Sequence, residues 1–420
     1  MGNKARYLHA ISREVANVAR PEGLRLDLFA GSGVVSRELA KQGPVVSADI
    51  QTYSKIFALA LTAPEVISGV RAKELVVSAT ENADRTLSRI QGLVALEDEA
   101  LRVAREDPAK LISLLECGSL AQSDVGSADL SLLRNDARQN LNPVANTLVW
   151  YYGGVYFSYR QAVFLDELLR IVRAQLSGNA MYTAIAAAMG TASDSVSTVG
   201  NHFAQPVQML TKHGEIKPAA VKMILSRRHI DPSAQFLGWL ERYSAISPSR
   251  FPCTAVTGDY INVLEENAAG ADVVYADPPY TRDHYSRFYH VLETMAVGDD
   301  PGVTFRPGTN EPSKGLYRVD RHQSPFSIRS QAPAAFRKLI SSVSSQEASL
   351  ILSYSPMGSG TVARPETRVI GVADLADLMS EAFRDVAVIN IDNSTHSRFN
   401  KRSLHGQIPS SAEILLVGKA

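Results

Sequence analysis

The apolar residues of the chain follow two different patterns. Short apolar runs, typical of buried strands, occur near both ends, at residues 24–29, 45–50, 254–257, 271–276, 349–355, 386–391 and 413–417. Between Thr52 and about Pro248, by contrast, Leu, Ala and Val recur at helical spacing, and strand-like stretches are few. The pattern predicts an α/β part built from both ends of the chain and a mostly helical segment inserted between them.

Helical patterns separate the predicted strands. Apolar residues at helical spacing predict helices over residues 8–18, 34–41, 334–343 and 372–383. We therefore expect residues 1–55 and 250–420 to form one domain, and residues 56–249 to form the helical insert. Residues 299–327 hold much Gly, Pro and charge, and we expect a long loop there that covers the functional site.

Composition restricts the class of protein. With 420 residues, of which 45% are apolar and 20% charged, the chain has the composition of a soluble globular protein. It contains no apolar run long enough to span a membrane, and its first residues lack the apolar core of a signal peptide. Cys117 and Cys253 are isolated, which makes a cytoplasmic location the expectation. The net charge of zero means that any nucleic-acid contact must come from local basic patches.

A glycine-rich turn follows the first predicted strand. Ala30-Gly31-Ser32-Gly33 precedes a helix and a second strand, which ends at Asp49-Ile50. Glycines let a ligand approach the backbone closely, and an acid at the end of the second strand can accept hydrogen bonds from ribose hydroxyls. The third glycine of a dinucleotide-binding turn and the Gly-Lys-Ser/Thr of a P-loop are both missing. The turn therefore predicts a site for a nucleoside-containing ligand other than a dinucleotide.

The apolar run at residues 271–276 ends at Asp277-Pro278-Pro279-Tyr280. Because prolines cannot continue a strand ladder, the chain must leave the sheet here as a stiff, extended loop. The loop presents a carboxylate, fixed carbonyls and an aromatic ring at the carboxyl end of a strand, where open α/β sheets bind ligands. An ordinary turn is compatible with the same four residues, so the motif alone leaves both interpretations open.

These motifs resemble those of methyltransferases. Asp277-Pro278-Pro279-Tyr280 is similar to the catalytic motif of enzymes that methylate an exocyclic amine, above all adenine N6. Asp27-x-x-x-Gly31-x-Gly33 resembles the S-adenosylmethionine loop of class I methyltransferases. The order of the motifs, with a helical insert between them, resembles the Dam-like (alpha-class) DNA adenine-N6 methyltransferases. The resemblance covers residues 1–55 and 250–420. It implies a class I, Rossmann-like mixed sheet with helices on both faces, and a target-recognition role for the insert.

The resemblance also implies roles for single residues. Lys4 would contact the carboxylate end of S-adenosylmethionine, and Asp277, Pro278 and Tyr280, with Pro279 between them, would form the amine site. The remaining cofactor residues would be those of the glycine loop and of the two acidic strand ends, namely Asp27, Ala30, Gly31, Gly33, Asp49, Ile50, Asp259 and Tyr260. The implied reaction is direct methyl transfer to an adenine flipped out of duplex DNA, with no metal and no covalent enzyme intermediate.

Basic residues give candidate DNA contacts. Residues 395–405 contain Arg398, Lys401 and Arg402 and no acid, and residues 212–250 include Arg227 and Arg228. We expect these side chains to hold backbone phosphates, although solvated helix faces would give residues 212–250 the same pattern. The aromatic stretch Trp150–Arg160 is compatible with a base-stacking platform or with a packed core.

Several rival functions share parts of the pattern. The same fold could act on RNA adenine or on cytosine N4, although cytosine-N4 enzymes more often carry Ser in place of Asp277. Enzymes that methylate a glutamine side-chain amide more often carry Asn at that position. A catalytically silent DNA-binding subunit is the rival from another class, and the intact Asp27, Asp49 and Asp277 argue against it. A cognate restriction or defence-system component is compatible with all of these as a partner.

Overall fold

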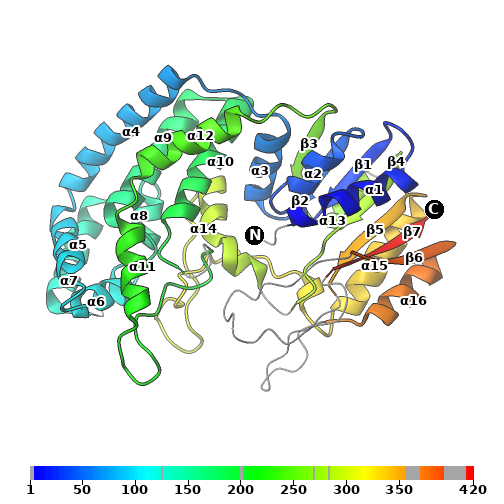
Figure 1. Cartoon of the computed structure of the whole chain (residues 1–420). Helices are drawn as coiled ribbons and strands as arrows, with labels where there is room; N and C mark the ends of the chain where they lie inside the picture. Colours follow the sequence, from blue (N-terminus) through cyan, green and yellow to red (C-terminus); the bar gives the residue numbers. More distant parts are fainter. Residues whose placement is uncertain are drawn as a thin grey trace. The chain divides into compact units, whose positions relative to one another are not determined.

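The computed structural model describes residues 4–123, 126–198, 202–267, 270–281, 284–355, 369–391 and 413–420 (Figure 1). The chain divides into two compact units. Unit 1 is drawn from residues 1–64, 247–285 and 322–420, and unit 2 from residues 65–246 and 286–321. Each unit is assembled from segments that are far apart in the sequence.

Unit 1 contains a seven-stranded sheet in the order β3-β2-β1-β4-β5-β7-β6. Strands β1 to β5 pair with one another in parallel, whereas β7 pairs antiparallel with both β5 and β6. The strand bounds are Leu24–Leu28 (β1), Val45–Asp49 (β2), Cys253–Thr257 (β3), Ala271–Ala276 (β4), Ser349–Tyr354 (β5), Asp385–Asn390 (β6) and Ile414–Lys419 (β7). All seven predicted strands are confirmed, because the central strands are buried on both faces and therefore read as nearly continuous apolar runs.

Helices cover both faces of this sheet (Figure 1). On one face, α1 (Leu8–Val18) and α2 (Val34–Leu39) pack Ile11, Val15, Val35 and Leu39 against β4, β5 and β7. On the other face lie α13 (Tyr260–Asn267), α15 (Ala332–Ser345) and α16 (Val372–Ala382). The remaining elements of unit 1 are α3 (Thr52–Thr62) and the short helices η1 (Lys4–Arg6) and η2 (Pro325–Ser327). The predicted mixed sheet between two helical layers is confirmed.

Unit 2 is helical in its described part. Its helices are α4 (Gly69–Ser88), α5 (Gln91–Val103), α6 (Ala109–Cys117), α7 (Ala128–Asn140), α8 (Thr147–Tyr152), α9 (Tyr159–Gln175), α10 (Gly178–Ser195), α11 (Pro218–Arg228), α12 (Pro232–Ser244) and α14 (Tyr285–Val297), which begins at the boundary with unit 1. The central helix is α9, whose residues are buried on nearly every side from Tyr159 to Val172. Ser158 and Gln161 form a capping box at its N-terminus.

The division of the chain differs from the expected one at the ends of the insert, where residues 56–64 and 247–249 belong to unit 1, and in residues 286–321. Residues 286–321 were expected in the same domain as the sheet, but they belong to unit 2. The physical reason is a set of buried polar contacts: Tyr152 Oη lies 3.2 Å from Thr294 Oγ1, and His290 Nε2 lies 3.0 Å from Phe203 O. The loop after α14 is likewise bound to unit 2, since Tyr156 donates to Gly315 O at 3.0 Å.

Among the described residues, no helix combines the length and the apolar character needed to cross a membrane.

Candidate active site

The glycine turn and the Asp-Pro-Pro-Tyr motif leave neighbouring strands at the same edge of the sheet. β1 and β4 are parallel, Leu28 is paired with Ala276, and the amide of Asp277 donates to Leu28 O at 3.4 Å. From β1 the chain proceeds to β2 on one side, whereas β4 lies on the other side. This is the topological switch point at which doubly wound sheets bind ligands, so the two motifs share one site.

The turn after β1 depends on Gly33. Phe29, Gly31 and Gly33 all have positive φ angles, of 63°, 52° and 73°. A Cβ atom on Gly33 would lie 2.7 Å from Ala58 Cα in α3, closer than packed atoms approach. Gly33 therefore allows both the left-handed backbone at the start of α2 and the close packing of α3.

The two predicted acidic strand ends are both half-buried and both bind backbone amides. Asp49 accepts hydrogen bonds from the amides of Gly31 and Gln51, each at 2.9 Å. Asp259 caps α13 by accepting from the amide of Ile261 at 3.0 Å. The amide of Gly258 donates to Asp49 O at 2.9 Å, which links the two strand ends. Both carboxylates are thus oriented at the edge of the sheet that carries the glycine turn.

An aromatic cluster lies beside these acids. The rings of Phe29, Tyr260 and Phe326 lie 5.2–5.4 Å apart, centroid to centroid. Tyr260 is half-buried, and burial raises its pKa to about 12, so its hydroxyl stays neutral. Ile50 is exposed next to Asp49. Of these, Tyr260 and Ile50 were predicted, whereas Phe29 and Phe326 were not, because nothing in the sequence separates an aromatic that lines a site from one that fills a core.

Asp27 is fully buried in the middle of the sheet. Ser36 donates to its Oδ2 at 2.5 Å, and Oδ1 has no hydrogen-bond partner among the described residues. Burial raises the pKa of Asp27 to about 7, against the opposing effect of the Ser36 hydrogen bond. An oxygen left in this state is costly unless a donor reaches it.

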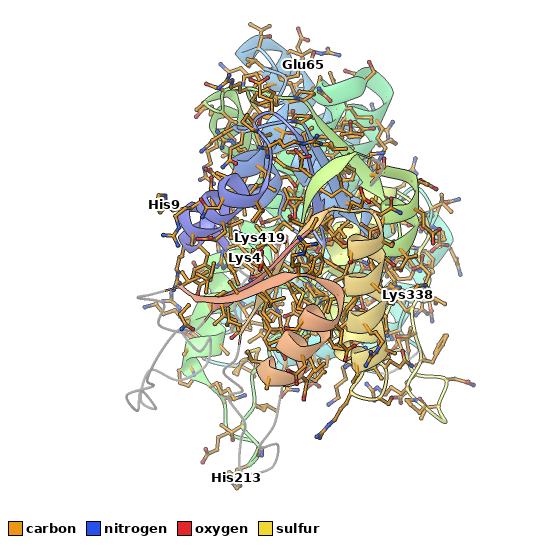
Figure 2. All side chains as sticks on the ribbon, turned by 90° about the vertical axis from the view of Figure 1, so that its right-hand side faces the viewer. Lys4, His9, Glu65, His213, Lys338 and Lys419 are labelled. Carbon is orange, nitrogen blue, oxygen red and sulfur yellow. The ribbon has the colours of Figure 1, made fainter. Side chains whose placement is uncertain are left out.

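Lys4, labelled in Figure 2, is buried in unit 1, and its ammonium group pairs with Asp277 of the motif. Its Nζ atom is 3.0 Å from Asp277 Oδ1, 2.7 Å from Glu413 Oε1 and 2.9 Å from Ser353 Oγ. Ser353 also donates to Glu413 Oε1 at 2.7 Å. The ammonium group donates hydrogen bonds to Ser353 and Glu413, and its contact with Asp277 is an ion pair. The contact of Lys4 with the cofactor's carboxylate that the resemblance implies stays a prediction.

Opposing charges set the ionisation of Asp277. Burial raises its pKa to about 6; the positive charge of Lys4 lowers it and the negative charge of Glu413 raises it. For Lys4, burial alone would lower the pKa, but the carboxylates of Asp277 and Glu413 outweigh it and the pKa is raised well above the ordinary value. The side chain of Asp277 is 23% exposed and that of Glu413 only 3%, so only Asp277 can meet a substrate.

The other motif residues surround this pair. Tyr280 packs at 5.3 Å, centroid to centroid, against Tyr354 of β5, and Lys4 Nζ lies 5.7 Å from the centre of the Tyr280 ring. Pro278 is buried and Pro279 partly exposed. Glu413 and Ser353 were not predicted as site residues. In the sequence, Glu413 is an acid at the start of an apolar strand, and Ser353 is one of the hydroxyl residues at the end of another. Neither feature indicates a contact with Lys4, which lies hundreds of residues away.

The residues predicted to contact DNA differ in their surroundings. Arg398, Lys401 and Arg402 lie outside the described residues. Arg228 is buried, and the prediction that it faces phosphate is wrong: it pairs with Glu97 at 2.5 Å and donates to Gly154 O at 2.9 Å. Sequence spacing could not reveal this, because Glu97 is on a different helix. Arg227 is partly exposed and donates to Asp194 O, so its assignment to DNA remains a prediction.

The aromatic stretch forms a core. Tyr152, Tyr156, Phe157 and Tyr159 are fully buried, and Tyr156 packs against Phe203 and His290. Of the two interpretations, packing is therefore the one that the structure supports, and no base can stack on these rings in this arrangement.

Fold and site together define a class I methyltransferase. The family model of the D12 class N6 adenine-specific DNA methyltransferases matches residues 1–102 and 240–351, just over half of the chain. The chain therefore belongs to this family, in agreement with the resemblance drawn from its motifs.

Two curated proteins are also similar to parts of the chain. Modification methylase LlaI of Lactococcus lactis subsp. lactis is 26% identical over 150 residues, which are 35% of this chain and 21% of that protein. Modification methylase StsI of Streptococcus sanguinis is 25% identical over 137 residues, 32% of this chain and 18% of that protein. The matched stretch thus spans about a fifth of the length of each relative.

Proposed function

We propose that the chain transfers a methyl group from S-adenosylmethionine to the N6 amine of adenine in duplex DNA. The observation that carries this proposal is the position of Asp277-Pro278-Pro279-Tyr280 at the end of β4, directly beside the glycine turn at the end of β1. The two motifs fit the two halves of the reaction, an amine acceptor and a nucleoside-containing methyl donor. Membership of the D12 family supports the same choice of substrate.

The amine site would activate a poor nucleophile. The lone pair of an aromatic amine is delocalised into the ring, and acceptors on both N–H groups favour a pyramidal nitrogen. Asp277 and the carbonyl of Pro278 supply two such acceptors, and the ring of Tyr280 offers a stacking surface for the base. Pro279 keeps the loop between them extended. After transfer the nitrogen is cationic, and Asp277 can receive the proton that it loses, since its pKa is near 6.

Lys4 would position Asp277, in addition to the contact with the cofactor's carboxylate that the resemblance implies. Its ammonium group fixes Oδ1 of Asp277 at 3.0 Å and favours the ionised carboxylate. Glu413 and Ser353 hold the ammonium group in turn. A carboxylate held in this way needs no reorganisation when the amine arrives, which is the condition for efficient stabilisation of developing charge.

The residues around the glycine turn fit S-adenosylmethionine. The buried Oδ1 of Asp27 lacks a donor among the described residues, and the amino-acid end of this cofactor carries a cationic amine that can supply one. Ala30, Gly31 and Gly33 form the turn beneath it, Asp49 suits ribose hydroxyls, and Asp259 with Tyr260 and Ile50 suits the adenine end. When bound, the cofactor supplies a methyl group on a sulfonium centre.

Unit 2 would recognise the target sequence, and the adenine would leave the stack to reach Tyr280. We place the protein in the cytoplasm, with duplex DNA as its main partner and a restriction or defence-system component as a further one. Arg227, and Arg398, Lys401 and Arg402 beyond the described residues, remain proposed phosphate contacts.

The direct test compares the wild type with Asp277→Ala. We expect methyl transfer from labelled S-adenosylmethionine to duplex DNA to fall by about 10²–10³-fold, because the amine then has one acceptor fewer. Calorimetric binding of S-adenosylmethionine should be retained. A parallel loss of cofactor binding would contradict the assignment of Asp277 to the amine site, and a wild type without transfer to DNA would contradict the proposed function itself.

A further inference from the structure

Two arginines of unit 2 lie over one tyrosine ring. The guanidinium carbon of Arg321 is 4.6 Å from the centroid of the Tyr317 ring, and that of Arg287 is 5.5 Å from the same point. Arg287 is exposed near the start of α14, and Arg321 is half-buried at the end of the loop that follows this helix. The ring itself is fixed, because its hydroxyl donates to Ala204 O and its edge packs against His290 at 5.3 Å.

Within the described part of the chain, neither Arg287 nor Arg321 forms an ion pair, and the hydrogen bond of Arg321 is made to a carbonyl, Arg318 O at 3.1 Å. Two acids of the same loop are already paired: Arg318 binds both Asp299, at 2.8 Å, and Asp320, at 3.0 Å. Burial and the charge of Arg287 lower the pKa of Arg321, whereas the pKa of Arg318 is raised by its two carboxylates.

A fixed pair of like charges without a counter-ion is unfavourable by itself and becomes favourable when an anion arrives. Planar guanidinium groups match phosphate oxygens and stack on aromatic rings, so an arginine held on a ring is pre-organised for phosphate. Because both groups are anchored on one ring, they can reach one phosphodiester or two neighbouring ones. Exposed Gln205, whose side chain reaches the Tyr317 hydroxyl, and the partly exposed His202, packed edge to face with Phe288 at 4.9 Å, add polar groups nearby.

We propose that Arg287 and Arg321, held over Tyr317, form a phosphodiester-binding site through which unit 2 binds the backbone of its DNA substrate. This inference rests on the proposed function, which supplies DNA as the ligand. It gives unit 2 a phosphate contact in place of Arg228, which is buried. The contact positions the duplex and is independent of base sequence.

The test measures binding of the full chain to a fluorescent mixed-sequence DNA duplex, by anisotropy, between about 50 and about 200 mM salt. For Arg287→Gln combined with Arg321→Gln we expect weaker binding at low salt. We also expect the slope of log affinity against log salt to become shallower by about 0.9 for each phosphate that the variant no longer neutralises. Arg287→Gln alone, which changes an exposed side chain, should show about half of this effect and guards against misfolding of the double variant.

The matched control is Arg306→Gln. Arg306 lies in the same loop, but it is already paired with Glu311 at 2.7 Å, so its removal should leave the salt slope unchanged. S-adenosylmethionine affinity should be the same in all variants. A salt slope for Arg287→Gln equal to that of the wild type would overturn the phosphate site while leaving the proposed function intact. A wild type that binds and methylates no duplex DNA would overturn both.

Discussion

The charge on Asp277 depends on two residues that shift its pKa in opposite directions. Removal from water raises the pKa to about 6, Lys4 lowers it, and Glu413 raises it. The ionised carboxylate is the stronger acceptor for an N–H group and the form that can take up the proton, so we expect kcat/KM for methyl transfer to fall about tenfold per pH unit below about pH 6. A pH–rate profile measures this directly. A profile that stays flat down to about pH 4.5 would show that the ionisation of Asp277 does not limit the reaction.

Substitutions of the two neighbours should move this profile in opposite directions. Lys4→Met removes the charge that lowers the Asp277 pKa, so the acid limb should shift to higher pH; Glu413→Gln removes the charge that raises it, so the limb should shift to lower pH. Lys41→Met, which removes an exposed lysine paired with Glu38, should leave the limb in place. Shifts of the same sign for Lys4→Met and Glu413→Gln would refute the positioning role.

At this scale the sequence predicted the motif residues but not their mutual arrangement. Asp277 and Gly33 were identifiable because the chemistry at a strand end limits which residue types fit. The pairing of Lys4 with Glu413 spans 409 positions, and no local pattern encodes it. The burial of Arg228 was missed for the same reason, because a basic side chain near the end of an amphipathic helix has the same spacing whether it faces solvent or a buried carboxylate.

At the scale of elements, the turn after β1 depends on its glycine. Gly33→Ala places a Cβ atom 2.7 Å from Ala58 Cα and forces a residue with φ of 73° into a strained conformation. We expect a loss of about 1–3 kcal/mol in the free energy of unfolding, together with weaker S-adenosylmethionine binding. Gly258→Ala is the control, since its Cβ would make only an ordinary contact, 3.5 Å from Val263. Equal losses for the two variants in thermal unfolding would argue against this role of Gly33.

The ion pair between α5 and α11 offers a second test at this scale. Arg228→Met leaves Glu97 buried without its charged partner, and we expect a loss of about 3–5 kcal/mol in stability. Arg160→Met breaks the neighbouring but exposed pair with Asp98 and should cost about 0–1 kcal/mol. Urea unfolding of both variants distinguishes them. A small loss for Arg228→Met would contradict its structural role and restore it as a candidate for DNA binding.

The central strands were predictable because burial on both faces of the sheet leaves continuous apolar runs. Helices α1, α2, α15 and α16 of unit 1 were predictable because each buries one face on the sheet. The long loop after α14 was also expected, but its attachment was not. Its anchors are single contacts such as Tyr156 to Gly315 O, and side-chain hydrogen bonds of this kind leave no periodic signal.

For the whole molecule, the chain crosses between the two units several times. Unit 2 includes residues 286–321, which follow β4 in the sequence, so it is not a single insertion at one point of the chain. The Asp277 motif and the start of α14 are consequently close in sequence but belong to different units. A variant of α14 such as Arg287→Gln can thus alter DNA binding while the amine site in unit 1 keeps its own contacts.

The central claim is that this molecule methylates adenine in DNA. The measurement that tests it most directly offers duplex DNA and total RNA in parallel with labelled S-adenosylmethionine, then digests both and identifies the labelled nucleoside. We predict N6-methyladenine in the DNA sample and none in the RNA sample. Label in N4-methylcytosine, or in RNA alone, would contradict the account.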